Sequence, residues 1–156
     1  MGRRGKSRKN GPMYVDRKLI RSRAFLELTG CAAQVYLLFR ARAQVVKAKS
    51  VPAKRSPWQI VNNGEIIFTY AEAEEDFGIT AKRFTRAIDQ LVAHGFLDIA
   101  HHGGGLKRDA SCYALSERWR GYGTAEFVPR ERPKGRRWVS RQKQSQRTKR
   151  DAVTRT

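Results

Sequence analysis

The chain of 156 residues suits one modest domain with extensions, and its 33 Lys and Arg against 14 Asp and Glu give a formal net charge of +19. No apolar run approaches the ~18 residues that a membrane span needs, and the basic N-terminus lacks the apolar stretch of a secretory signal. Two cysteines make no disulfide framework, which favours a reducing cytoplasm.

The positive charge gathers at the two ends of the chain. Residues 1–23 carry nine Lys or Arg and one acid, and residues 129–156 carry eleven and two. Residues 24–128 carry thirteen and eleven, so the middle is nearly neutral. A balanced body between basic arms is typical of proteins that bind a polyanion. Neither arm shows the apolar stripe of a membrane-surface helix, so nucleic acid is the expected partner and a membrane is not.

This composition predicts three segments. Residues 1–13 are expected to be a disordered basic arm, because they have almost nothing apolar to bury. Residues 14–128 are expected to form the domain, and residues 129–156 a disordered basic tail. Inside the domain, residues 47–63 read as a long basic loop that is either functional or mobile. We expect Trp58 to dock this loop to the body.

The first part of the domain is expected to be helical. Apolar side chains between Tyr14 and Leu28 begin the folded body, and Thr29–Gly30 marks a break. A helix over roughly 31–46 is apolar on nearly all sides, which is typical of a central packing element. Cys31 at its start is expected to be a small buried apolar residue rather than a ligand or nucleophile.

Strand signals surround the end of the basic loop. Residues 58–61 can form a short strand, and Asn63–Gly64 is a strong tight-turn signal. A second strand is expected over residues 65–70. An acidic helix over 71–77 should then end at Gly78, because glycine takes the left-handed conformation without a Cβ penalty.

A longer helix is expected between Thr80, a favoured N-cap, and Gly95. Its apolar residues recur at helical spacing and predict one inward stripe. That stripe consists of Phe84, Ala87, Ile88 and Leu91.

Two strands, over 96–101 and 111–115, follow this helix and are expected to form a hairpin. The order of strand, short helix, glycine turn, longer helix and hairpin predicts an α+β winged helix-turn-helix of three to four helices with a C-terminal β-hairpin wing. An ordinary helical hairpin with a solvated basic face is the alternative. Aromatic residues beyond the hairpin are expected to fold back onto the body. They are Trp119, Tyr122 and Phe127.

No residue pattern predicts catalysis, a cofactor or a metal. Gly103–Gly105 lies at the hairpin tip and lacks the Lys-Ser/Thr and helix of a phosphate-binding loop. The acids between residues 72 and 76 suit a solvated helix face better than a hard-cation site. A zinc site at His101, His102 and Cys112 would need a fourth ligand, and there is no Cys-x-x-Cys pair. We therefore expect a protein that is not an enzyme.

In helix-turn-helix proteins the second helix lies in the major groove and its early exposed residues reach base edges. Arginine can pair with guanine and glutamine with adenine, while small methyl groups contact thymine. The basic arms would add salt-sensitive attraction that does not depend on sequence. The expected recognition-helix residues are Thr80, Ala81, Lys82, Arg83, Thr85, Arg86 and Gln90, and the expected wing residues are His102, Gly104, Lys107 and Arg108.

Residues 65–115 resemble the winged-helix domains of plasmid and phage replication initiators and replisome organisers, and short helix-turn-helix proteins of bacterial mobile elements. The similarity lies in the run from Ile79 to Leu91 and in Gly95-Phe96-Leu97-Asp98-Ile99 after it. The chain departs from them in its basic loop at 47–63 and in lacking a catalytic or ATPase domain. The resemblance implies double-stranded DNA binding in transcription regulation or replication initiation, at the nucleoid in the cytoplasm. A second copy of the chain, or a replication or transcription protein, would be a further partner.

Two other classes stay open. The basic arms suit an RNA-binding or ribosome-associated protein equally well, and winged helices also serve as protein-interaction modules. Recognition of exposed RNA bases would call for an aromatic platform, and none is expected on the outward face of the helix after Thr80. Double-stranded DNA is therefore the preferred partner.

Overall fold

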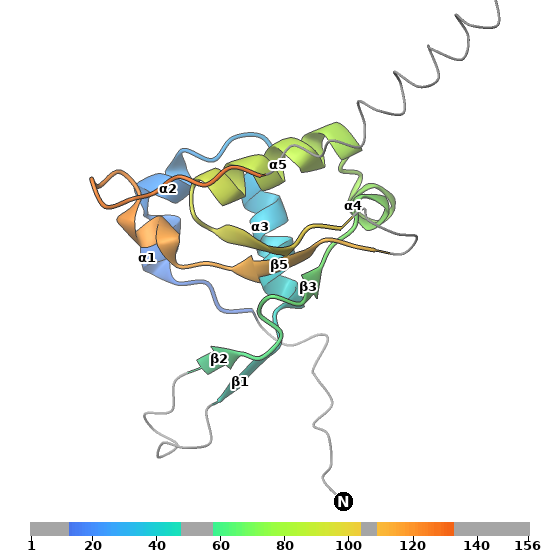
Figure 1. Cartoon of the computed structure of the whole chain (residues 1–156), viewed down its shortest axis with the longest axis horizontal. Coiled ribbons are helices and arrows are strands. Elements are labelled where there is room, and N and C mark those ends of the chain that lie inside the picture. Colours follow the sequence, from blue (N-terminus) through green and yellow to red (C-terminus); the bar gives the residue numbers. More distant parts are fainter. Residues whose placement is uncertain (1–12, 48–57, 104–108, 133–156) are drawn as a thin grey trace, which may run out of the picture.

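The computed structural model describes residues 13–47, 58–103 and 109–132. This part of the chain is a mixed α and β structure (Figure 1). None of the helices within the described ranges has the length and apolar character that a membrane crossing requires. The helices are α1 (Arg17–Ile20), α2 (Arg23–Leu26), α3 (Ala32–Arg42), α4 (Tyr70–Phe77), α5 (Ala81–Ala93) and the 3-10 helix η1 (Arg118–Gly121). The strands are β1 (Val45–Lys47), β2 (Trp58–Ile60), β3 (Ile66–Ile67), β4 (Leu97–His101) and β5 (Cys112–Leu115).

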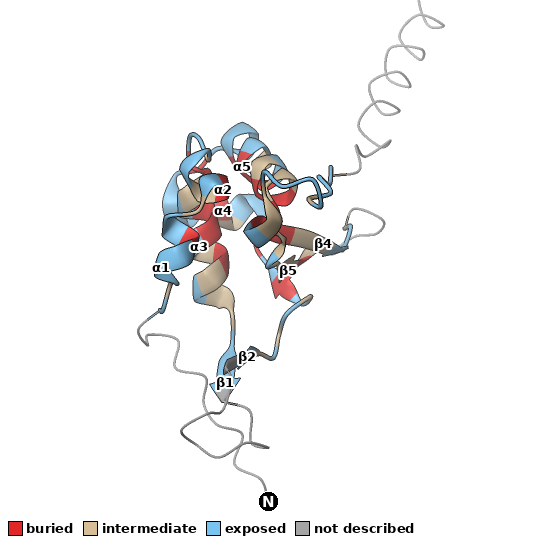
Figure 2. Ribbon diagram, turned by 90° about the vertical axis from the view of Figure 1, so that its left-hand side faces the viewer, coloured by how far each residue is buried: buried red, intermediate tan, exposed pale blue. Residues whose placement is uncertain are grey.

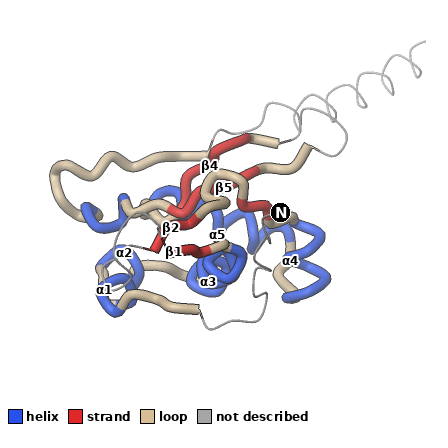
Figure 3. Tube along the Cα trace, turned by 90° about the horizontal axis from the view of Figure 1, so that it is seen from below, coloured by secondary structure: helices blue, strands red, loops and turns tan. Residues whose placement is uncertain are grey.

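The strands form two separate antiparallel sheets. In the larger one β5 lies between β3 and β4, and Tyr113 is paired with Ile66 on one side and Ile99 on the other. The smaller one consists, within the described residues, of β1 paired with β2. This ribbon projects from the body in Figures 1 and 2 and lies in front of it in Figure 3, which is seen from below. The predicted hairpin and the predicted short strand at the end of the basic loop are both confirmed. Residues 48–57 of that loop lie outside the described residues.

The core lies between α3, α5 and the three-stranded sheet (Figure 2). Phe39 on α3 and Phe84 on α5 are fully buried, and the ring of Phe68 contacts both at 5.4 and 4.8 Å between centroids. The predicted inward stripe of α5 is confirmed, because all four of its residues are at most 2% exposed. Cys31 is a buried free cysteine, as expected.

Glycines end both α4 and α5. Gly78 has φ +63° and its amide donates to the carbonyl oxygen of Glu74, so the predicted left-handed stop is confirmed. Gly95, with φ +84°, follows α5. Thr80 precedes α5 at the N-cap position, as predicted, but its side chain makes no capping hydrogen bond. The hydroxyl of Thr69 accepts from the amide of Glu72 and starts α4, so the strand expected over 65–70 is cut short at β3.

The helix predicted over 31–46 is too long. It ends at Arg42, and Val45 and Val46 instead lie in β1, where they pair with β2. Valine is stiff at χ1 and packs well in strands, so the change from helix to strand follows the side chains present.

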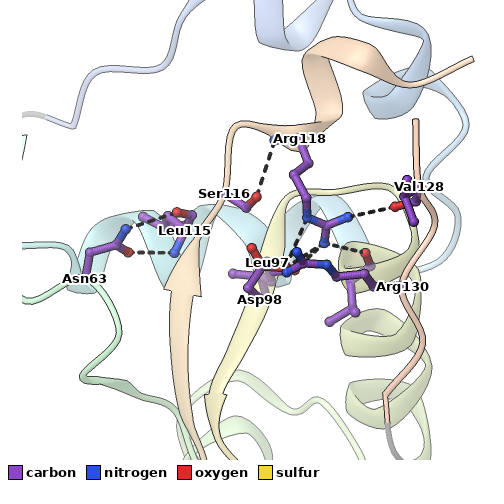
Figure 4. Close-up of polar contacts among 9 residues, drawn as sticks. Asn63, Leu97, Asp98, Leu115, Ser116, Arg118, Val128 and Arg130 are labelled. Atoms are coloured by element: carbon purple, nitrogen blue, oxygen red, sulfur yellow. Dashed lines mark hydrogen bonds and ion pairs between the residues drawn. The ribbon is translucent and has the colours of Figure 1, made fainter. Parts of the chain in front are cut away.

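Two consecutive asparagines fix the base of the ribbon. Asn62 accepts a hydrogen bond from the amide of Gln44 at 2.8 Å and donates one to the carbonyl oxygen of Arg42 at 3.0 Å. Asn63 makes a two-bond pairing with the main chain of Leu115, donating at 3.1 Å and accepting at 2.7 Å (Figure 4). Side chains therefore join the ribbon to the end of α3 and to the end of β5.

The residues after β5 fold back onto the body, which confirms the expectation for their aromatic side chains. Trp119 on η1 is 5% exposed and stacks on Phe96, with ring centroids 6.1 Å apart. Tyr122 stacks on His94 at 4.8 Å and meets Phe127 edge-on at 5.2 Å. The segment beyond η1 is thus held against the end of α5.

Candidate nucleic-acid interface

The outer face of α5 carries a cluster of exposed cations. The apolar stripe of α5 and Val92 are packed into the core, and most of the polar side chains of the helix lie on its other side. Three of these, Lys82, Arg83 and Arg86, are positively charged and exposed. Thr80 and Ala81 at the start of the helix are exposed too. The first two turns therefore present a positive surface rich in hydrogen-bond donors.

Tyr70 and Arg132 border one side of this face. The hydroxyl of Tyr70 lies 3.3 Å from the hydroxyl of Thr85 and accepts a hydrogen bond from Nη1 of Arg132 at 3.0 Å. Nε of Arg132 lies 2.9 Å from Oδ1 of Asp89. Thr85 and Asp89 lie one turn apart on the same side of α5. They are thereby tied to α4 and to the chain after η1.

The turn before α3 borders the opposite side. The amide and the hydroxyl of Thr29 donate to Oε1 of Gln90 at 2.9 and 3.2 Å. The thiol of Cys31 donates to the carbonyl oxygen of Arg83 at 3.6 Å. Gln90 and Thr85 are half-buried by these neighbours, whereas the other predicted recognition-helix residues are exposed.

The residues predicted to form the wing fall between β4 and β5 in the sequence, at the end of the hairpin where His101 pairs with Cys112. Nε2 of His101 lies 2.6 Å from Oδ1 of Asp109, and the amide of Gly103 donates to the hydroxyl of Ser111 at 3.1 Å. His102 is exposed at this end of the hairpin. The other predicted wing residues, which lie outside the described residues, are Gly104, Lys107 and Arg108.

Arg118 joins the hairpin to α5 and to the C-terminal segment (Figure 4). Its Nε and Nη2 donate to Oδ1 of Asp98 at 3.1 and 2.7 Å. Nη2 also donates to the carbonyl oxygens of Val92 at 3.1 Å and Leu97 at 3.2 Å. Nη1 donates to the carbonyl oxygen of Val128 at 3.5 Å. One guanidinium group therefore holds the end of α5, the start of β4 and the segment after η1.

Asp98 is shared by two arginines. Nη1 of Arg130 lies 2.9 Å from the same oxygen that Arg118 contacts. Burial on its own raises the pKa of Asp98, but the hydrogen bond and charge of Arg118, with the charge of Arg130, outweigh burial and lower it. The carboxylate is thus kept ionised between its two partners.

Sequence reasoning does not identify Arg118, Arg130 and Arg132 as organising residues. It predicts a tail that begins at residue 129, yet residues 129–132 are described and contact α4, α5 and β4. In the sequence, Arg130 and Arg132 are two among eleven cations of a basic segment. No local pattern sets apart the arginines that have acidic partners in the fold.

Within the described ranges, no group of three or more His, Cys, Asp or Glu residues is placed to hold a metal ion. Comparison of the chain with protein-family models, with curated proteins and with solved structures found no match. The exposed cations of α5 and the arginine contacts around them are therefore the observations on which a function is proposed.

Proposed function

We propose that this protein binds double-stranded DNA as a winged helix-turn-helix, with α5 in the major groove. The element order α3, β3, α4, α5, β4, β5 supports this, as does the strand order β3-β5-β4. In the proposed arrangement α4 and α5 are the helix-turn-helix, joined at Gly78, and the hairpin β4–β5 is the wing.

The observation that carries the proposal is the outer face of α5. Lys82, Arg83 and Arg86 are exposed there, on a helix whose other side is fixed in the core. Arginine can donate two hydrogen bonds to guanine, and lysine or arginine can contact phosphate. The single acid on α5, Asp89, has its charge offset by Arg132. On α5 itself, a DNA surface would therefore meet cations without an unpaired carboxylate.

The two basic ends of the chain add attraction for the DNA backbone. Most of the net charge of +19 lies in them, and such attraction is independent of sequence and sensitive to salt. The proposed role is transcription regulation or replication initiation in a bacterium or mobile element, by binding and without catalysis. A second copy of the chain, or a protein of the replication or transcription apparatus, is the proposed further partner.

Selection from a pool of random duplexes at ~150 mM salt, with structured RNA as competitor, tests the proposal. We expect enrichment of a defined duplex sequence, and retention of binding when RNA is added. Arg86→Ala should reduce the enrichment, while Arg21→Ala, which changes an exposed arginine after α1, should preserve it. A pool that shows no enrichment, or duplex that RNA displaces, would overturn the proposal.

A further inference from the structure

Arg132 lies against both helices of the proposed helix-turn-helix. The chain after η1 runs back along α5 (orange in Figure 1) and brings this residue to the side of the helix. Nε of Arg132 lies 2.9 Å from Oδ1 of Asp89 on α5, and Nη1 donates to the hydroxyl of Tyr70 on α4 at 3.0 Å. The side chain of Arg132 is 21% exposed. The two contacts therefore orient the guanidinium group without covering it completely.

The hydroxyl of Tyr70 accepts two hydrogen bonds. One comes from Arg132, which can only donate, and the other comes from the hydroxyl of Thr85 at 3.3 Å. Tyr70 is 39% exposed, and its ring packs edge-on against Phe84 with 5.1 Å between centroids, which fixes the direction of the side chain. Because the oxygen already accepts twice, its O–H proton is available to donate to a group outside the protein.

The guanidinium group of Arg132 also has donors beyond those that it uses. A guanidinium group carries five N–H bonds in a planar fork, and the contacts with Asp89 and Tyr70 employ Nε and Nη1. Nη2 supplies two further N–H bonds in the same plane. The pair of Tyr70 and Arg132 therefore combines a positive charge with several oriented donors, and such a group suits the oxygens of a phosphate.

The pair lies where the edge of a DNA groove would fall. An α-helix with its side chains is about 10–12 Å across and the major groove of B-DNA is about 12 Å wide, so a helix in the groove fills it. Groups that flank such a helix then lie level with the sugar-phosphate strands. Tyr70 and Arg132 flank α5 on the side of Thr85, whereas Thr29 flanks it on the side of Gln90. With α5 in the groove, one DNA strand would pass over Tyr70 and Arg132.

We propose that the hydroxyl of Tyr70 and the guanidinium group of Arg132 form a binding site for one backbone phosphate of the DNA duplex, at the edge of α5. Asp89 orients the guanidinium group. The site sets the register of α5 in the groove and reads no sequence itself, because every nucleotide offers the same phosphate. This inference rests on the proposed function, since the duplex is the ligand of α5.

A contact with a single phosphate is tested by making the phosphates neutral one at a time. A methylphosphonate linkage replaces one charged oxygen with a methyl group. Each phosphate of the selected duplex is replaced in turn, and the affinity of the full chain is measured by fluorescence anisotropy. The variants are Tyr70→Phe and Arg132→Lys, with Tyr14→Phe and Arg120→Lys as matched controls. Tyr14 is 79% exposed ahead of α1, and Arg120 on η1 pairs with Glu117.

We expect Tyr70→Phe and Arg132→Lys each to weaken duplex binding by about fivefold or more, because each removes an oriented hydrogen bond to the phosphate. The loss should be equal on the selected duplex and on a random one, since phosphate contacts are not sequence-specific. The salt dependence of the affinity should change little, because neither substitution removes a charge. The two control variants should bind as the wild type does.

The duplex carrying the methylphosphonates identifies the phosphate. Replacement at one position should weaken binding by the wild type by a factor similar to that of the protein variants. At this position Tyr70→Phe and Arg132→Lys should lose almost nothing further, because the protein and DNA changes remove the same contact. The controls should lose affinity there as the wild type does.

Wild-type affinity in Tyr70→Phe, or losses that add to the methylphosphonate loss at every position, would overturn the phosphate site. A loss confined to the selected duplex would overturn it as well, since Tyr70 would then contact a base. Tyr70→Phe keeps the ring that packs on Phe84, and its thermal melt checks that the variant is folded. A wild-type chain that binds neither duplex at low salt would instead overturn the proposed function, so the two failures are distinguishable.

Discussion

The side-chain oxygen of Gln90 accepts two hydrogen bonds from Thr29, one from the amide at 2.9 Å and one from the hydroxyl at 3.2 Å. The two residues are separated by 61 positions in the chain, so these bonds fasten the turn before α3 to the middle of α5. The sequence predicts that Gln90 reads bases. In the structure its oxygen holds the helix in place.

We expect Gln90→Ala to lower the free energy of unfolding by about 1–2 kcal/mol, because the amide of Thr29 loses its acceptor. Urea denaturation measures this loss. Discrimination between the selected duplex and a random one should stay close to wild type, as measured by anisotropy. A large loss of discrimination with unchanged stability would return Gln90 to the base-reading set.

Arg83→Ala and Arg86→Ala should each weaken binding to a selected duplex by about 1–3 kcal/mol, and binding to random duplex much less. Both side chains are exposed on the outer face of α5, where bidentate pairing with guanine is available to them. Competition titrations with the two duplexes give the ratio of the affinity for the selected duplex to the affinity for the random one. Equal losses on both would mean that these arginines contact only phosphate.

Leu91→Ala should cost roughly 2–5 kcal/mol in unfolding free energy, because Leu91 on the inner side of α5 is fully buried and truncation of its side chain leaves a cavity. Leu26→Ala is the matched control, since Leu26 is 72% exposed on α2. Thermal melts of the two variants should differ widely. Similar melting temperatures would contradict the orientation of α5 described above.

Gly95→Ala should be far more damaging than Gly78→Ala, although both glycines end helices with positive φ. A Cβ at Gly95 would lie 2.7 Å from the amide nitrogen of Trp119, whereas at Gly78 nothing lies within 4 Å. Gly78→Ala should therefore cost only about 1–2 kcal/mol of backbone strain. Gly95→Ala adds a clash with the main chain of η1. Chemical denaturation measures the unfolding free energy of both variants. Equal losses of stability would show that η1 moves aside easily.

Asp98→Asn should make the protein less stable near neutral pH and flatten its response to acid. The pKa of Asp98 is lowered in the folded state, so its contribution is complete above the unfolded-state pKa of about 3.9 and is lost as pH falls through the folded value. At pH 7 the loss should be about 1–3 kcal/mol, since Arg118 and Arg130 keep only a neutral partner. Unfolding measured at pH 7 and pH 3 should therefore differ less for the variant than for wild type. If the unfolding free energy of the variant and of the wild type changed equally with pH, Asp98 would not be the ionised partner of Arg118 and Arg130.

Local signals are enough to predict α4, α5 and the hairpin that follows them. Gly78 and Gly95 mark helix ends through backbone freedom alone, and the stripe from Phe84 to Leu91 identifies the buried side of α5. The valines at 45 and 46 favour a strand, but the end of α3 at Arg42 is not predicted. Asn62, twenty residues further on, donates a hydrogen bond to the carbonyl oxygen of Arg42. Such a contact leaves no trace in the local pattern.

The arrangement around α5 is predictable only in part, for the same reason. Exposed cations on the helix follow from its periodicity, and Lys82 and Arg86 are placed as expected. The pairing of Asp89 with Arg132 is not predicted, because it joins residues far apart in sequence. Charge composition counts an arginine in the same way whether or not it has an acidic partner in the fold.

The two asparagines at the base of the β1–β2 ribbon have a consequence for how the chain can be altered. The chain enters the ribbon at Gln44 and leaves it at Val61, and the amide of Val61 donates to the carbonyl oxygen of Gln44 at 2.9 Å. The two ends of the ribbon are therefore neighbours. Directly after this junction, Asn62 bonds to Arg42 at the end of α3 and Asn63 bonds to Leu115 at the end of β5. A tight two-residue turn, a longer arm or a reporter peptide can be spliced in at this junction, which gives the protein a natural insertion site remote from α5.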